Sequence, residues 1–231
     1  MRTLRLAAMV LVWMPAPAAA APICLPGSLT SYKALGGAGC EIDGTAFTDF
    51  SSAPSFFGGD EIAADDVTVI PMLAAPGPRL DFAMTAAAGP GEVVGIVIGY
   101  SGASPSLASA ALSMDGASAG PLDGVVTAVM DICLDGGFAG DPATCSGFLD
   151  TLIVAHDVDG PTGPDARMLM ASLFDVLLDI TIDGGPLGAA ALDGTVTNQF
   201  GAAQVPEPST VPLLALGALG LTLRRRRSAS R

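Results

Sequence analysis

The sequence of 231 residues has very few of the side chains that most catalytic and cofactor sites require. It contains one histidine, His156, and one tryptophan, Trp13. No HExxH zinc motif, phosphate-binding P-loop, GxSxG elbow or GxGxxG dinucleotide fingerprint occurs in it. We therefore predict that the protein is not an enzyme. The alternative is a secreted hydrolase that uses a triad of His156 with Asp157 or Asp159, but no particular serine is marked for it.

Positive charge is also scarce outside the two ends of the chain. Seven of the ten basic residues lie near the termini, and only Lys33, Arg79 and Arg167 lie between them. In contrast, 22 of the 23 acidic residues fall between Glu41 and Asp193. So acidic a stretch repels nucleic acids and anionic lipids, and we expect no nucleic-acid partner.

The four cysteines leave no odd thiol and form no CxxC pair, which argues against a zinc ribbon or a thioredoxin-like site. Three connectivities are open to four cysteines. We predict the local one, in which each bridge closes a short segment, because export exposes the thiols to oxidation. The predicted bridges are Cys24–Cys40 and Cys133–Cys145.

The first 20 residues have the parts of a secretory signal peptide. Arg2 and Arg5 provide the positive n-region, and residues 6–14 form a short apolar segment. Small residues follow at Ala18, Ala19 and Ala20, as signal peptidase requires. We predict export across the inner membrane and cleavage after Ala20.

Residues 21–204 read as one body with a mainly β fold, an antiparallel, jelly-roll-like β-sandwich. Residues 176–183 alternate apolar and polar side chains, which indicates a half-buried strand. Residues 164–171 are the best helix candidate, and they are equally consistent with a loop that leads into a strand. The turns predicted from Asp-Gly pairs lie at 115–116, 123–124, 135–136 and 183–184. The predicted strands are 45–50, 66–71, 79–85, 92–100, 107–115, 124–134, 148–157, 174–183 and 190–200.

One acidic turn in the body is a candidate metal site. Asp157 and Asp159 precede Gly160 and would offer two carboxylates to calcium, with Asp131, Asp135 or Asp141 as further ligands from a neighbouring loop. The turn lacks the remaining ligands of an EF-hand, including the closing glutamate. A solvated acidic turn is the favoured interpretation, so no cofactor is expected and any calcium effect should be small.

The C-terminal segment, residues 205–231, has three features in a fixed order. Pro206, Glu207 and Pro208 come first, the uncharged apolar run 211–223 follows, and four arginines end it. Thirteen helical residues span about 20 Å, less than the roughly 30 Å of a bilayer core. Such a short transmembrane helix is a weak anchor, and the arginines, which stop transfer, would stay on the cytoplasmic side. These arginines are Arg224, Arg225, Arg226 and Arg227.

This order of features resembles the PEP-CTERM sorting signal of exopolysaccharide-producing Gram-negative bacteria. The resemblance implies an exosortase-type processing enzyme as a partner, which makes this chain a substrate of catalysis. Residues 29–50, 180–185 and 191–200 also resemble the first and last strands of many PEP-CTERM proteins. We therefore expect a non-catalytic protein of the cell surface or extracellular matrix that is anchored transiently and then released, with extracellular polysaccharide as a candidate partner. The alternative is a module that binds glycans or other ligands, for which calcium would be an optional stabiliser.

Overall fold

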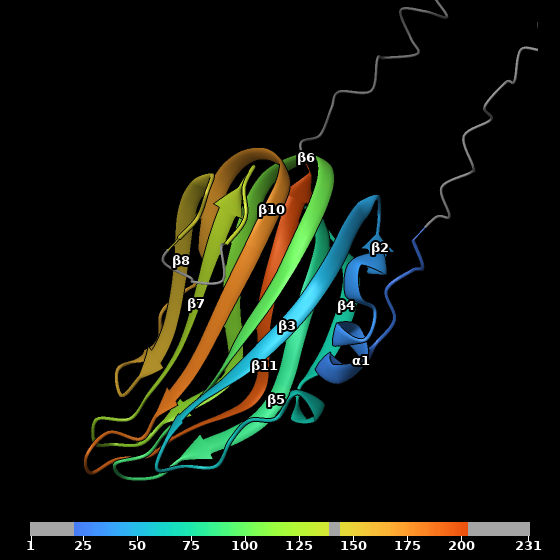
Figure 1. Cartoon of the computed structure of the whole chain (residues 1–231). Coiled ribbons are helices and arrows are strands. Elements are labelled where there is room, and N and C mark those ends of the chain that lie inside the picture. Colours follow the sequence, from blue (N-terminus) through green and yellow to red (C-terminus); the bar gives the residue numbers. More distant parts are fainter. Residues whose placement is uncertain (1–20, 139–143, 203–231) are drawn as a thin grey trace, which may run out of the picture.

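The computed structural model describes residues 21–138 and 144–202, and this part of the chain is built almost entirely of β-strands (Figure 1). Three short helical turns lie near its start: α1 (Leu29–Lys33), η1 (Gly36–Ala38) and η2 (Ala64–Asp66). The strands are β1 (Gly27–Ser28), β2 (Cys40–Ile42), β3 (Thr45–Phe57), β4 (Thr68–Ala74), β5 (Gly77–Ala88), β6 (Val93–Ala119), β7 (Val125–Leu134), β8 (Phe148–Asp157), β9 (Gly160–Pro161), β10 (Asp165–Asp183) and β11 (Ala190–Ala202).

These strands form one continuous antiparallel sheet. Its order is β1-β4-β5-β11-β6-β10-β7-β8-β9, and β3 pairs with both β2 and the first half of β6. The prediction of a mainly β, antiparallel fold is therefore confirmed. The described residues do not divide into two separate sheets, however, because β6 and β10 are long enough to serve both layers of a sheet that curls on itself.

The two long strands bend where their pairing with each other shifts register. The shifts lie between Met168 and Leu173 of β10, opposite the middle of β6. The first half of β6 pairs with β3, and its second half pairs with β11. The two stretches predicted as separate strands, 92–100 and 107–115, are thus one strand. The chain bends between these two stretches without a turn, because a bulge bends a strand without ending it.

The helix candidate at 164–171 is wrong, and its residues begin β10. Asp165, Ala166 and Arg167 pair with residues 110–112 of β6, and only Leu169 among residues 168–171 is buried. The good helix formers in this segment are overridden by the neighbouring strand, which offers backbone partners that an isolated helical turn lacks.

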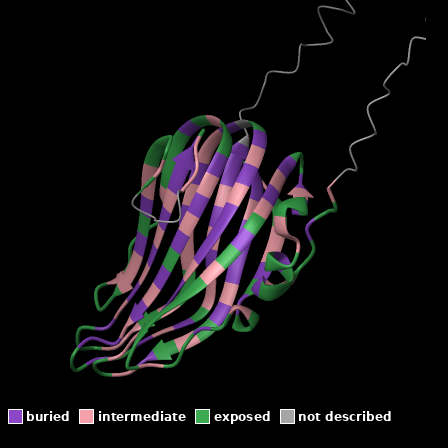
Figure 2. Cartoon of the chain, in the orientation of Figure 1, coloured by how far each residue is buried: buried purple, intermediate pink, exposed green. Residues whose placement is uncertain are grey.

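Alternating side chains of the strands build the core between the two layers (Figure 2). In β10, Val176, Leu178, Ile180 and Ile182 are buried, as their spacing predicted. At the centre of the core lies an aromatic cluster that joins the layers: ring centroids are 4.8 Å apart for Phe174 and Phe200, and 6.1 Å apart for Phe82 and Tyr100. The other members of the cluster are Tyr32, Phe47 and Phe50.

Three of the four predicted Asp-Gly turns lie at strand ends, and the fourth does not. Asp123 and Asp135 have φ values of 63° and 51°, the left-handed conformation that short polar residues tolerate in turns. The fourth pair lies within β6, where Gly116 has a φ of 75° and faces Asp193 across a register shift. A Cβ atom on Gly116 would lie 2.4 Å from the Asp193 carbonyl oxygen, so this position requires glycine and forms a bulge.

Candidate functional site

The C-terminal sorting segment is attached to the body through β11, which lies inside the sheet between β5 and β6. Successive side chains near the end of this strand point to opposite faces. Phe200 is 1% exposed and enters the aromatic cluster. The Gln199 side chain donates hydrogen bonds from Nε2 to the carbonyl oxygens of Ala74 and Ala75, at 3.2 and 2.8 Å. The last residues of β11 are therefore fixed on both faces before the chain leaves the body.

An ion pair beside β11 strengthens this attachment. The Asp81 carboxylate on β5 accepts hydrogen bonds from Arg79 Nε at 2.8 Å and from Thr197 Oγ1 at 2.6 Å. Asp81 is only 4% exposed, and its hydrogen bond raises the pKa of Arg79 above its ordinary value. The carboxylate thus links β5 to β11 across the outer face of this layer.

A buried polar pair links the same strand to the opposite layer. Asn198 Nδ2 donates to the Tyr100 hydroxyl at 2.7 Å, and both side chains lie in the core. Burial raises the pKa of Tyr100 well above its usual value, an effect that the Asn198 hydrogen bond partly opposes. The Asn198 Oδ1 atom has no hydrogen-bond partner among the described residues. The sequence pattern predicts a strand at Asn198 but gives no sign of this pair, because partners 98 residues apart leave no local signal.

The predicted sorting residues themselves lie outside the described part of the chain. This applies to Pro206, Glu207 and Pro208, to the apolar run 211–223 and to Arg224–Arg227. It also applies to the signal peptide, residues 1–20. None of the helices among the described residues has the length and apolar character needed to cross a membrane.

Comparison with known families bears directly on this C-terminal segment. A family model described as the PEP-CTERM protein-sorting motif matches residues 204–227. The chain carries a PEP-CTERM sorting motif. The match begins two residues after β11 ends and includes the Pro-Glu-Pro, the apolar run and the arginines. The motif marks an exported protein that is targeted to an exosortase and sorted at the cell envelope. No curated protein matches the chain.

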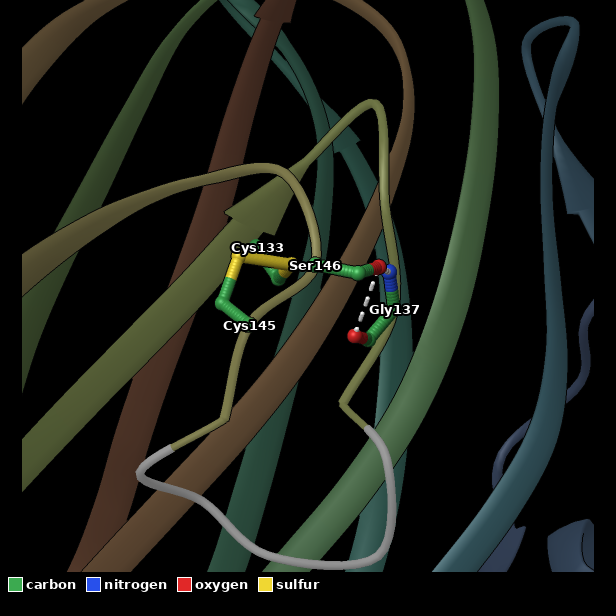
Figure 3. Close-up of a disulfide and its surroundings, with 4 residues drawn as sticks. All are labelled: Cys133, Gly137, Cys145 and Ser146. Atoms are coloured by element: carbon green, nitrogen blue, oxygen red, sulfur yellow. Dashed lines mark hydrogen bonds between the residues drawn. A yellow bond between two sulfur atoms is a disulfide. The ribbon is translucent and has the colours of Figure 1, made fainter.

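Both predicted disulfides are present. Cys24 pairs with Cys40, and Cys133 pairs with Cys145, with Cα–Cα distances of 4.8 and 5.5 Å. The second bridge joins the end of β7 to the segment before β8 (Figure 3). Beside it, Ser146 Oγ accepts a hydrogen bond from the Gly137 backbone N–H at 3.0 Å. The local connectivity follows from the β7–β8 hairpin, which brings the two cysteines to adjacent strand ends.

The candidate calcium ligands are not brought together. The Asp157 carboxylate accepts the backbone N–H of Asp159 at 2.9 Å, which is a local turn contact between β8 and β9. Asp131 lies five residues from the β7 partner of His156, roughly 16 Å along the strand. Asp135 lies farther along, where it accepts backbone N–H groups of β10. Within 21–138 and 144–202, no three metal-ligating side chains cluster, and Asp141 lies outside these ranges.

His156 lies near the end of β8 and is half-buried, as predicted for a residue at a strand's end. Its ring makes no hydrogen bond to Asp157, Asp159 or any serine among the described residues. Tyr32 and Tyr100 would have to be exposed to stack on a sugar, but each is only 3% exposed and belongs to the core.

The edge of β8 that faces away from β7 pairs with β9 only near its end, and polar side chains with little local sequence signal cover the rest. Its outward N–H groups at Thr151, Ile153 and Ala155 donate to side-chain oxygens, at 2.9, 3.1 and 2.7 Å. The three acceptors belong to Asp150, Asp165 and Thr162. Arg167 joins two of them, since it donates to Asp165 and lies 3.8 Å from Asp150. The only sequence signal for this arrangement was a run of polar residues around β9.

Proposed function

We propose that this protein is a non-catalytic component of the cell surface or extracellular matrix, delivered through its PEP-CTERM tail. The observation that carries the proposal is the motif at 204–227, which follows directly on the end of β11. In this scheme signal peptidase removes residues 1–20, and the apolar run 211–223 then holds the exported body at the inner membrane of a Gram-negative cell. Arg224–Arg227 stop its transfer, and an exosortase cuts near Pro206-Glu207-Pro208.

The organisation of the body supports delivery as a finished, stable domain. Two disulfides and a continuous core suit a protein that must persist outside the cell. The short apolar run suits a temporary anchor, because it falls short of a full bilayer span. The released body would then reside among extracellular polysaccharide.

A module that binds glycans is the second proposal, and the described residues give it little support. Sugar-binding faces usually present aromatic rings to solvent. Tyr32 and Tyr100 are buried here, while Phe56 and Phe57 are adjacent in β3, so their side chains point to opposite faces. A hydrolase has less support, because within the described ranges no serine or aspartate makes a hydrogen bond with the His156 ring.

The sorting step can be tested with the full chain in a host that contains the processing enzyme. We expect the wild type to lose its tail and leave the membrane fraction, as measured by fractionation and intact mass. Glu207→Gln should instead accumulate as a longer membrane-bound precursor, if the enzyme reads the carboxylate. Glu61→Ala, at an exposed acidic residue of the body, is the matched control and should be processed normally. Retention of Arg231 in the mature wild-type protein would contradict the proposal.

The arginine cluster gives a separate test of anchoring. Replacement of Arg224–Arg227 by serine should release unprocessed protein from the membrane, because nothing would then stop translocation.

A further inference from the structure

The two ends of the curled sheet differ in chemistry, and the tail leaves from only one of them. Ala202 of β11 pairs with Leu107 at the bend of β6, which in turn pairs with Ala171 at the bend of β10. The β4–β5 turn joins them through Gln199. We call this end of the molecule, formed by the end of β11, the two bends and this turn, the tail end. It lies at the top of Figure 1.

Exposed apolar side chains surround the point where the tail leaves. On the β10 side, Met168, Met170 and Leu173 are 84, 93 and 56% exposed, and Phe148 at the start of β8 is 67% exposed. On the opposite side, next to the β4–β5 turn, Leu73 is 65% exposed. We call these five residues the tail-end rim. Exposed apolar groups gathered in one region of a surface commonly mark a contact site. The opposite end also exposes large apolar side chains, but they lie among its carboxylates, so charge and the exit of the tail distinguish the two ends; these side chains are Phe56, Phe57, Leu122, Val158 and Leu187.

The tail end carries fewer carboxylates than the opposite end, and among them Glu41 and the exposed Asp43 lie in the same hollow as Leu73. The β4–β5 turn and the bends of β6 and β10 contain no charged residue. Asp135, at the end of β7, is engaged by the backbone N–H groups of Ser172 and Leu173. The opposite end is strongly acidic, because its turns carry Asp60, Glu61, Asp65, Asp66, Glu92, Asp123, Asp157, Asp159 and Asp183.

We propose that the tail-end rim rests on the outer surface of the phospholipid bilayer while the tail holds the chain in the membrane. This inference rests on the proposed anchoring function. Eight residues separate Ala202 from the apolar run at 211, and a fully extended chain of that length reaches about 27 Å. The body can therefore settle onto the bilayer. Methionine, leucine and phenylalanine enter the headgroup–acyl boundary, whereas the acidic end is repelled by anionic headgroups and points away.

This seating has a consequence for processing. A body held against the bilayer keeps the chain between Ala202 and the apolar run near the membrane surface, where a membrane-embedded enzyme acts. Once the tail is cut, the rim alone is a weak membrane ligand, because it is small and the rest of the body is acidic. The same surface thus assists retention before processing and permits release afterwards.

Single tryptophans at the two ends provide the test. The sole native tryptophan is replaced by Trp13→Phe, and a reporter is introduced by Met170→Trp at the tail-end rim or by Leu187→Trp near the acidic end. Each full-length variant is reconstituted in phosphatidylethanolamine–phosphatidylglycerol vesicles that contain brominated phosphatidylcholine. We expect blue-shifted, strongly quenched emission from Met170→Trp and unchanged emission from Leu187→Trp. The native Leu187 side chain is 71% exposed, so a tryptophan there should stay in water.

Flotation of the same vesicles separates failure of this inference from failure of the anchoring function. Protein that floats with the vesicles but shows no quenching at position 170 is anchored without seating, which overturns the rim proposal alone. Equal quenching of both reporters also overturns it, because no end would then be preferred. Protein that does not float contradicts tail anchoring and, with it, the seating. A blue shift that appears only when the processing enzyme is added would identify the enzyme as the occupant and exclude the lipid surface.

Discussion

Tyr32 and Tyr100 are the only tyrosines in the chain, and the fold buries both. The Tyr32 hydroxyl donates to the Leu25 carbonyl oxygen at 2.8 Å, and burial raises the pKa of Tyr32 to about 12. Burial raises the pKa of Tyr100 further still. Burial favours the neutral form of each hydroxyl. As the pH rises, these hydroxyls therefore lose their protons more readily in the unfolded chain than in the folded one.

We predict cooperative alkaline unfolding that both tyrosines report. An unfolded tyrosine loses its proton near pH 10, whereas the folded Tyr32 does so near pH 12. The stability linked to Tyr32 is therefore complete below pH 10 and is lost as the pH rises towards 12, a change of about 2 kcal/mol. Tyrosinate absorbance should rise together with loss of far-UV circular dichroism. Ionisation of both hydroxyls in a protein that keeps its β signal would contradict this.

At the scale of elements, β8 is a strand whose outer edge is closed by side chains. Unpaired strand edges invite pairing with another chain, and natural proteins block them with charges and local hydrogen bonds. Three outward N–H groups of β8 are occupied by Asp150, Asp165 and Thr162. Exposed Ile153 and Phe148 on the same strand would favour association if the edge were open.

We predict that the double substitution Asp150→Ala and Asp165→Ala produces dimers or larger species through β8. Size-exclusion chromatography with light scattering measures this directly. Asp157→Ala removes a carboxylate from the neighbouring turn without freeing an edge N–H of β8, so it should leave the oligomeric state unchanged. Thermal melts of all variants show whether association precedes unfolding. A double variant with the same mass as the wild type at equal concentration would disprove the edge role.

For the whole molecule, the shared core, the two disulfides and the curled sheet supply stability. In the acidic turn, the Asp157 carboxylate accepts the backbone N–H of Asp159. The Asp131 carboxylate accepts a hydrogen bond from Thr151 Oγ1 at 2.5 Å. We therefore predict that the melting temperature differs little between excess calcium and excess chelator. A calcium-dependent rise of many degrees would reveal a site that includes residues outside the described ranges.

The sorting motif and the main features of the fold were accessible from the sequence because their signals are local. A sorting motif is a linear order of residues, and the match at 204–227 confirms it. Strand β8 was predicted at its observed bounds, and the alternation in β10 identified its buried face. The disulfide pairing was also accessible, since each bridge closes a segment of 16 or 12 residues.

The long-range features were decided only by the tertiary structure. Residues 164–171 have helix-forming side chains, yet they form a strand because β6 offers backbone partners for them. Asp165 pairs with Leu112, which lies 53 positions earlier in the chain. The Tyr100–Asn198 and Asp81–Thr197 contacts join residues about a hundred positions apart, so no local pattern encodes them. By itself, the sequence determined that the chain carries a sorting motif and where most of the strands lie. The curl of the sheet determined which side chains meet and which chemistry surrounds the exit of the tail, because both depend on strands that neighbour each other only after folding.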